Sequence, residues 1–223
     1  MLTLTACARE AEPADERAAP AAVAPAVDPP RNVVIVGTSL TAGYGVGEDV
    51  AYPARIQQMI DAAGLRYRVV NAGISGETSA GGLRRIDWTL QQPVDVLVLE
   101  LGANDGLRGI DPGEMRSNLE KIIEHARETH PGIALVIAGM QAPPNLGDQY
   151  TARFRDVFTE LADKYDAALV PFLLDSVAAQ PHLNIEDGLH PNAAGHEIIA
   201  RAVWRVLEPV LRARAQRASG DDS

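Results

Sequence analysis

The chain has 223 residues, of which 46% are hydrophobic and 22% are charged, and its formal net charge is -10 at pH 7. This composition is typical of one globular domain large enough to bury a substantial core, and the acidic excess disfavours binding to nucleic-acid phosphates. The single cysteine, Cys7, excludes an intramolecular disulfide, and no cysteines and histidines have the spacing of a structural zinc site.

Residues 1–30 are expected to precede the folded domain. Residues 4–7, LTAC, are similar to the lipobox at which bacterial lipoprotein precursors are cleaved and lipidated, although the segment resembles a truncated signal peptide without its charged region. A start site placed too late and a chance match both remain open. Residues 8–30 are rich in Ala, Pro and Glu and are typical of a disordered spacer. A genuine lipobox would make the protein a periplasmic or membrane-anchored bacterial lipoprotein, tethered through Cys7.

Five short apolar runs predict buried β-strands. The first occupies residues 33–37, VVIVG, and the others occupy residues 67–70, 94–101, 133–139 and 168–172. Between and after these runs, apolar residues recur at helical spacing. The predicted helical segments lie at residues 56–63, 83–90, 115–126, 154–161 and 198–207.

The alternation of strands and helices implies βαβ units and therefore a parallel sheet with helices on both faces. We predict an α/β fold, a three-layer α/β/α sandwich with a five-stranded parallel sheet, over residues 31–212, followed by a polar tail at residues 213–223. In such sheets the functional residues gather on loops beyond the carboxyl ends of the strands. No run of apolar residues is long enough for a transmembrane helix.

The first strand is followed by residues 37–45, GTSLTAGYG. Ser39 lies one tight turn beyond the strand, where its hydroxyl can face a cleft. A serine at this position can also simply cap a helix or a turn.

Two further strand ends carry similar segments. Residues 71–78, NAGISGET, follow the second strand, and Gly73 could expose its backbone N–H toward the same cleft or only serve a turn. The third strand ends in GANDG at residues 102–106, where Asn104 and Asp105 could likewise form a turn.

The segment DGLHP at residues 187–191 stands just before the last predicted helix. Its spacing lets the Asp187 carboxylate accept a hydrogen bond from Nδ1 of His190 and direct Nε2 toward a nucleophile. Alone this motif is a weak signal. Together with the three strand-end segments it is a strong signal, because all four positions meet at one edge of the predicted sheet.

These blocks resemble those of the GDSL/SGNH hydrolases, which supply a nucleophilic Ser, a Gly, an Asn and a terminal Asp-x-x-His-Pro. The matching residues here are Ser39, Gly73, Asn104, Asp187 and His190. The resemblance spans residues 33–207. Within the family, residues 37–45, 102–109 and 141–147 look most like the bacterial arylesterase, acyl-CoA thioesterase I and lysophospholipase L1 branch. One departure is Thr38, which stands where the family block usually has Asp.

The resemblance implies a flavodoxin-like fold and a serine esterase that needs no cofactor or metal. Its catalytic triad would be Ser39, Asp187 and His190, and its oxyanion hole would combine the N–H groups of Ser39 and Gly73 with the Asn104 amide. The implied substrates are short to medium acyl esters, together with thioesters and lysophospholipids.

Two loops that follow the carboxyl ends of the third and fourth predicted strands are expected to line the substrate pocket. Leu107 and Ile110 belong to the first, and Pro143 and Asn145 to the second. Two other functions remain open: a carbohydrate O-acetylesterase with the same triad, favoured by polar pocket loops, and a catalytically inactive, anchored binding protein.

Overall fold

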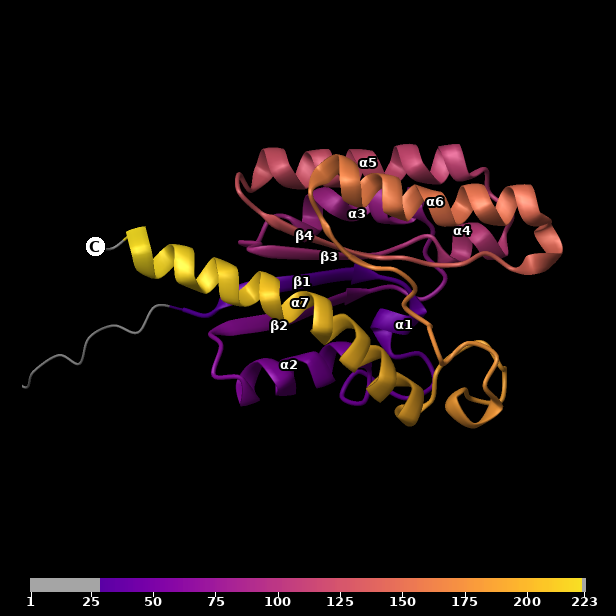
Figure 1. Cartoon of the computed structure of the whole chain (residues 1–223), viewed down its shortest axis with the longest axis horizontal. Helices are drawn as coiled ribbons and strands as arrows, with labels where there is room; N and C mark the ends of the chain where they lie inside the picture. Colours follow the sequence, from indigo (N-terminus) through magenta and orange to yellow (C-terminus); the bar gives the residue numbers. More distant parts are fainter. Residues whose placement is uncertain (1–28, 222–223) are drawn as a thin grey trace, which may run out of the picture.

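The computed structural model describes residues 29–221 (Figure 1). Its five strands are β1 (Arg31–Gly37), β2 (Tyr67–Gly73), β3 (Val96–Glu100), β4 (Ala134–Ala138) and β5 (Ala168–Val170). The predicted lipidation site, Cys7, lies outside the described residues, so its modification stays a prediction.

All strands pair in parallel, in the order β2-β1-β3-β4-β5. The helices are α1 (Ser39–Ala42), α2 (Tyr52–Ala62), α3 (Ser79–Thr89), α4 (Ala103–Leu107), α5 (Pro112–Thr129), α6 (Asp148–Tyr165) and α7 (Ala193–Asp221), with 3-10 turns at Pro144–Leu146 and Pro181–Leu183. Helices α3, α5 and α6 cover one face of the sheet, and α2 and α7 cover the other (Figure 1). The predicted three-layer α/β/α sandwich with a five-stranded parallel sheet is confirmed.

The strand order creates a crevice at one edge of the sheet. Because β1 lies between β2 and β3, the chain leaves β1 toward one side of the sheet and leaves β3 toward the other. Loops that diverge in this way open a gap beyond the carboxyl ends of the strands, and ligands bind there in open α/β sheets. Ser39 follows β1 and Asn104 follows β3, so the fold brings both to this gap.

The core explains why the apolar runs form strands. The side chains of β1 from Val33 to Val36 and those of β3 from Val96 to Leu99 are almost fully buried between the helical layers. The helices turn one apolar stripe toward the sheet, as the predicted spacing requires. The segment before α5 also matches its sequence signal, since the Asp111 side chain accepts a hydrogen bond from the Gly113 N–H and Pro112 opens the helix.

The last helix is longer than the sequence pattern suggested. Helix α7 continues as far as Asp221, so most of the predicted tail at residues 213–223 extends the helix instead. Leu211 is fully buried one turn beyond Leu207, and its carbonyl accepts a hydrogen bond from the Tyr67 hydroxyl. The helix therefore continues beyond its last strongly apolar stretch because this turn packs against β2. Within residues 29–221 no helix is both long and apolar enough to cross a membrane.

Candidate active site

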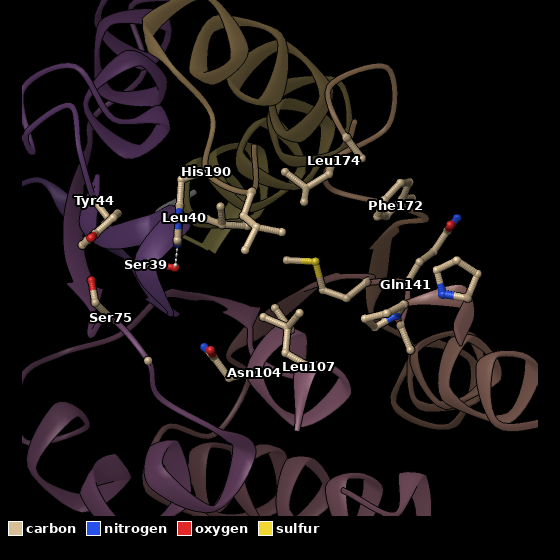
Figure 2. A pocket seen from close by; sticks show the side chains of 18 residues that line it. Ser39, Leu40, Tyr44, Ser75, Asn104, Leu107, Gln141, Phe172, Leu174 and His190 are labelled. Carbon is tan, nitrogen blue, oxygen red and sulfur yellow. Dashed lines mark hydrogen bonds between the residues drawn. The ribbon is translucent and has the colours of Figure 1, made fainter. Parts of the chain in front are cut away.

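Serine, histidine and aspartate side chains form one hydrogen-bonded row at the carboxyl edge of the sheet. His190 Nε2 lies 2.9 Å from Ser39 Oγ, and His190 Nδ1 lies 2.6 Å from Asp187 Oδ2. Figure 2 shows the Ser39 hydroxyl and the His190 ring pointing toward each other. The structure thus brings together the three residues that the sequence indicated as a triad. In this arrangement the imidazole can take the serine proton while the carboxylate stabilises the resulting positive charge.

Asp187 is held in its ionised form by the turn that carries it. Its Oδ1 accepts the backbone N–H groups of Leu189 and His190, each at 2.9 Å, while Oδ2 faces the imidazole. The hydrogen bonds from the His190 backbone and side chain, and from the Leu189 backbone, lower the pKa of Asp187 to about 2. Asp187 therefore remains a carboxylate at neutral pH and fixes the tautomer of His190.

The loop bearing the aspartate and histidine is anchored at both ends of the turn. The Ile185 N–H donates to the His190 carbonyl at 2.8 Å, and Asn184 pairs with Pro191 in an isolated antiparallel bridge. The buried Asn184 amide also donates to the carbonyls of Val177 and Gln180, at 2.8 Å each. These bonds hold the triad loop against the segment after β5.

Ser39 is the first residue of the one-turn helix α1, directly after β1. The helix ends at Ala42 and is followed by its C-cap Gly43, whose φ of 76° is in the left-handed region that glycine tolerates. A methyl group at Gly37 would collide with the side chains of Thr41 and Glu100, so the chain can pack this turn closely onto β3 only with glycine there. The sequence prediction of a tight turn after the first strand is confirmed.

Asn104 supplies a side-chain amide to the same crevice. Gly102, with a φ of 118°, turns the chain sharply after β3 and places Asn104 in the first turn of α4. One proton of the Asn104 amide is used by the Glu77 carbonyl, with a distance of 3.0 Å. The amide carries a second N–H, which is available to an oxyanion in the cavity that Asn104 lines.

The prediction that Gly73 offers its N–H to the crevice is wrong. Strand β2 continues to Gly73, and the Gly73 N–H donates to Asn71 Oδ1 at 3.0 Å. Gly73 instead packs against the backbone of Thr41 and Ala42. Because β2 runs three residues beyond the predicted end at residue 70, the loop reaches the cavity only after Gly73.

Gly76, rather than Gly73, is the glycine of this segment that lies beside the crevice. It lines the cavity, and its φ of 78° is in the region that favours glycine. Among residues 29–221 neither its N–H nor that of Ser39 is engaged in a hydrogen bond. The candidate oxyanion donors are therefore the N–H groups of Ser39 and Gly76 and the Asn104 amide.

Asp105 orients this part of the site, a role that the sequence did not indicate. It is fully buried, and it accepts the Ser79 N–H at 2.8 Å and the Ser79 hydroxyl at 2.6 Å. Asp105 thereby ties α4 to the first turn of α3. Since Gly76 lies just before α3 and Asn104 lies in α4, this contact fixes the spacing between the two candidate donors. The available signal in the sequence was an acidic residue directly after Asn104 in the GANDG segment.

The triad opens into a cavity of about 500 Å³. Ser39 and His190 lie at one end, and Leu107, Leu174 and Phe172 follow further along (Figure 2). The remaining wall is also largely apolar. It includes Leu40, Ala103, Met140, Ala142, Pro143, Pro144, Ala178 and Leu189.

Two of the four predicted pocket residues are in the wall, and two are not. Leu107 and Pro143 line the cavity. Ile110 follows the end of the short helix α4, where its carbonyl accepts the Tyr150 hydroxyl at 2.6 Å, and Asn145 is exposed on a 3-10 turn. The predictions for Ile110 and Asn145 are wrong, because hydrogen bonds to Asp105 and Tyr150 hold the Ile110 backbone outside the wall and Asn145 is exposed to solvent.

The sequence analysis did not indicate Phe172 and Leu174. They follow β5, so the rule that function gathers at strand ends could have found them. Tyr44, whose ring packs 4.6 Å from the His190 ring between centroids, was also missed. It lies within the segment around Ser39, but nothing in the sequence linked it to the distant histidine.

A hydrogen-bonded Ser-His-Asp row at the carboxyl edge of a flavodoxin-like parallel sheet is the arrangement of a serine hydrolase. The chain belongs to the GDSL-like lipase/acylhydrolase family, whose model matches residues 35–198. The resemblance predicted from the sequence blocks is thus confirmed.

Individual relatives agree with this assignment. The chain is 38% identical to the esterase TesA of Pseudomonas aeruginosa over 81% of this chain and 90% of that protein. It is 35% identical to the thioesterase 1/protease 1/lysophospholipase L1 of Escherichia coli K12, over 80% of this chain and 84% of the relative. A crystal structure of TesA superposes with a TM-score of 0.76 at 37% identity, covering 80% of this chain and 99% of the other.

Proposed function

We propose that this protein is a serine esterase that hydrolyses short to medium acyl esters through an acyl-enzyme on Ser39. The observation that carries the proposal is the hydrogen-bonded row of Ser39, His190 and Asp187 opening into an apolar cavity. The row supplies a nucleophile with its base, and the cavity supplies a surface for a hydrocarbon chain.

In the first half of the reaction, His190 Nε2 accepts the proton of Ser39 as Oγ attacks the acyl carbonyl carbon. The carbonyl oxygen becomes an oxyanion, which the N–H groups of Ser39 and Gly76 and the Asn104 amide are placed to stabilise. When the tetrahedral intermediate collapses, the bond to the alcohol breaks and the imidazolium protonates the departing oxygen.

In the second half, water replaces the alcohol. His190 removes a proton from the water, the hydroxide attacks the acyl-serine, and collapse releases the carboxylic acid and returns the proton to Ser39. The His190 side chain is 24% exposed and lines the cavity, so water can reach it from there. Asp187 stabilises the imidazolium in both halves.

The apolar wall favours acyl groups over sugars. Leu107, Leu174 and Phe172 present hydrocarbon rather than hydrogen-bonding groups along the cavity, so a carbohydrate O-acetylesterase is disfavoured. An inactive binding protein is disfavoured by the intact triad geometry. Thioesters and lysophospholipids are further candidate substrates, supported by the similarity to the Escherichia coli thioesterase 1/protease 1/lysophospholipase L1.

A series of p-nitrophenyl esters from acetate to laurate, with an acyl-CoA and a lysophospholipid alongside, tests the proposal. Ser39→Ala should lower turnover by at least about 10⁴-fold and abolish labelling by a fluorophosphonate probe. Ser75→Ala is the matched control, since Ser75 lines the same cavity but has no histidine partner in the described chain. Substantial turnover by Ser39→Ala would reject the proposed mechanism.

A further inference from the structure

A buried carboxyl group lies directly beneath the nucleophile. Glu100 is the last residue of β3 and is fully buried, opposite Gly37 in the sheet register. Among residues 29–221 it has no ion-pair partner, and it does not line the cavity. Contact with a substrate therefore cannot explain why an acidic residue is buried here.

The hydrogen bonds of Glu100 all come from the turn that carries Ser39. Oε2 accepts the Thr38 N–H at 2.8 Å and the Thr41 hydroxyl at 2.7 Å, and Oε1 lies 3.0 Å from Thr38 Oγ1. Thr38 immediately precedes the nucleophile, and Thr41 lies in the same short helix. A carboxyl group that binds both ends of one helical turn fixes that turn against β3.

The other groups facing this cluster are neutral near pH 7. Tyr52 of α2 lies with its hydroxyl 2.7 Å from Thr41 Oγ1, and burial together with Glu100 raises its pKa well above the usual range. Burial lowers the pKa of His196 to about 4, and its Nδ1 accepts the Tyr52 N–H at 3.2 Å. Neither side chain therefore balances a charge on Glu100, and Arg55, the α2 cation that acts on His196, forms its ion pair with Glu197 instead.

We propose that Glu100 is a positioning residue that places the Ser39 hydroxyl against His190 and aims the Ser39 N–H into the cavity, by hydrogen bonding rather than by charge. The inference rests on the proposed function, because it concerns the same nucleophile. Glu100 acts on Ser39 through the backbone of Thr38. The Thr38 N–H donates to Glu100, and the next N–H along the chain is that of Ser39, the candidate oxyanion donor.

Hydrogen bonding is sufficient because the partners of Glu100 can adapt to either protonation state. Burial raises the pKa of Glu100 to about 7, so the carboxyl group binds a proton readily. When Oε1 is protonated, the Thr38 hydroxyl can accept from it instead of donating, and Oε2 keeps the Thr38 N–H and the Thr41 hydroxyl. Thr38, which replaces the Asp of the family block, provides this reversible partner, whereas an Asp would set two carboxyl groups against each other.

Two substitutions separate position from charge. Glu100→Gln keeps the length and an oxygen for the Thr38 N–H, while its amide can donate to the Thr38 hydroxyl. Glu100→Asp keeps the carboxyl group, but the side chain is shorter by one methylene and the carboxyl group lies further from Thr38 and Thr41. We expect kcat within about 3-fold of wild type for the Gln variant and at least about 10-fold lower for the Asp variant, because small displacements of a reacting group are costly. KM should change less than about 2-fold in both, since neither change touches the cavity wall.

The matched control is Thr89→Val, which alters a buried threonine of α3 away from the cavity and should change stability but not kcat. The proposal is overturned if the Gln variant is as slow as the Asp variant, because charge would then matter, or if both have wild-type kcat. If Glu100→Asp does not fold, Thr38→Val is compared with Thr38→Ser: Val should be at least about 3-fold slower, and equal rates overturn the proposal. An active Ser39→Ala would instead refute the proposed function itself.

Discussion

The Asn104 side-chain amide donates a hydrogen bond to the Glu77 carbonyl at 3.0 Å and thereby joins the loop after β3 to the loop after β2. Because the carbonyl uses one amide proton, the other N–H has a defined direction. Oriented donors of this kind stabilise a developing oxyanion without reorganising during the reaction. The two loops therefore form one preorganised wall of the candidate oxyanion hole.

Asn104→Ala should lower kcat by about 10² to 10³-fold, equivalent to about 3 to 4 kcal/mol of transition-state stabilisation, because one oxyanion donor is lost. The free energy of unfolding should change much less. Steady-state kinetics with a p-nitrophenyl ester and urea denaturation measure the two effects. Asn32→Ala is the matched control: its amide donates to the Pro93 carbonyl at 2.7 Å, at the opposite end of β1 from Ser39 and outside the cavity, and kcat should be preserved. An Asn104→Ala variant with wild-type kcat would remove this side chain from the mechanism.

The strands and the triad could be predicted because their signals are local. Uninterrupted apolar runs in β1 and β3 follow from burial on both faces, and the DGLHP spacing is itself the geometry of an Asp-His pair. The edge strand β2 was placed less well. Its last residues, from Asn71 to Gly73, are polar or small and belong to the strand only through backbone pairing with β1.

The position at which β2 ends determines which glycine of the segment NAGISGET reaches the cavity. Backbone pairing cannot be seen in side-chain periodicity, so the sequence did not separate Gly73 from Gly76. Leu107 and Ile110 show the same limit, since Leu107 closes the five-residue helix α4 and lines the cavity, whereas Ile110, three residues further on, does not. Glu100 did leave a signal, because a charged residue closing a buried strand requires partners.

Asp187→Asn should lower kcat by roughly 10³ to 10⁴-fold, because an amide can hold His190 in the wrong tautomer and cannot stabilise the imidazolium. The low pKa of Asp187, about 2, also means that its protonation does not produce the acid limb of the pH-rate profile above about pH 4. Glu186→Gln, at the neighbouring exposed acid, is the control and should retain activity. Similar rates for the Asn and Gln variants would contradict the assignment of Asp187.

Leu107→Ala should weaken hydrolysis of longer esters selectively. Leu107 lines the cavity but is 55% exposed, so the lost contact with an acyl chain is worth about 1 kcal/mol, or roughly 5-fold in kcat/KM. Acetate, which is too short to reach the side chain, should be hydrolysed as before. Ile110→Ala is the paired control, because Ile110 lies outside the wall. The assignment fails if both variants show the same change across the ester series.

The buried Glu100 should make stability fall as pH rises. Its pKa is raised from 4.5 to about 7 in the folded protein, so the folded state binds the proton more tightly than the unfolded state does. Stability from this group is therefore present in full below the unfolded pKa and is lost as pH rises toward about 7. A difference of this size corresponds to about 3 kcal/mol.

Glu100→Gln removes the ionisation, so its free energy of unfolding relative to wild type should increase by about 3 kcal/mol between about pH 4 and pH 8. Urea denaturation across this range measures the difference, with Thr89→Val as a buried variant whose offset from wild type should not depend on pH. A constant offset for Glu100→Gln would mean that the pKa of Glu100 is the same in the folded and the unfolded protein. Its hydrogen bonds to Thr38 and Thr41 would then balance the effect of burial, Glu100 would be ionised at neutral pH, and the Thr38 hydroxyl would serve there only as a donor.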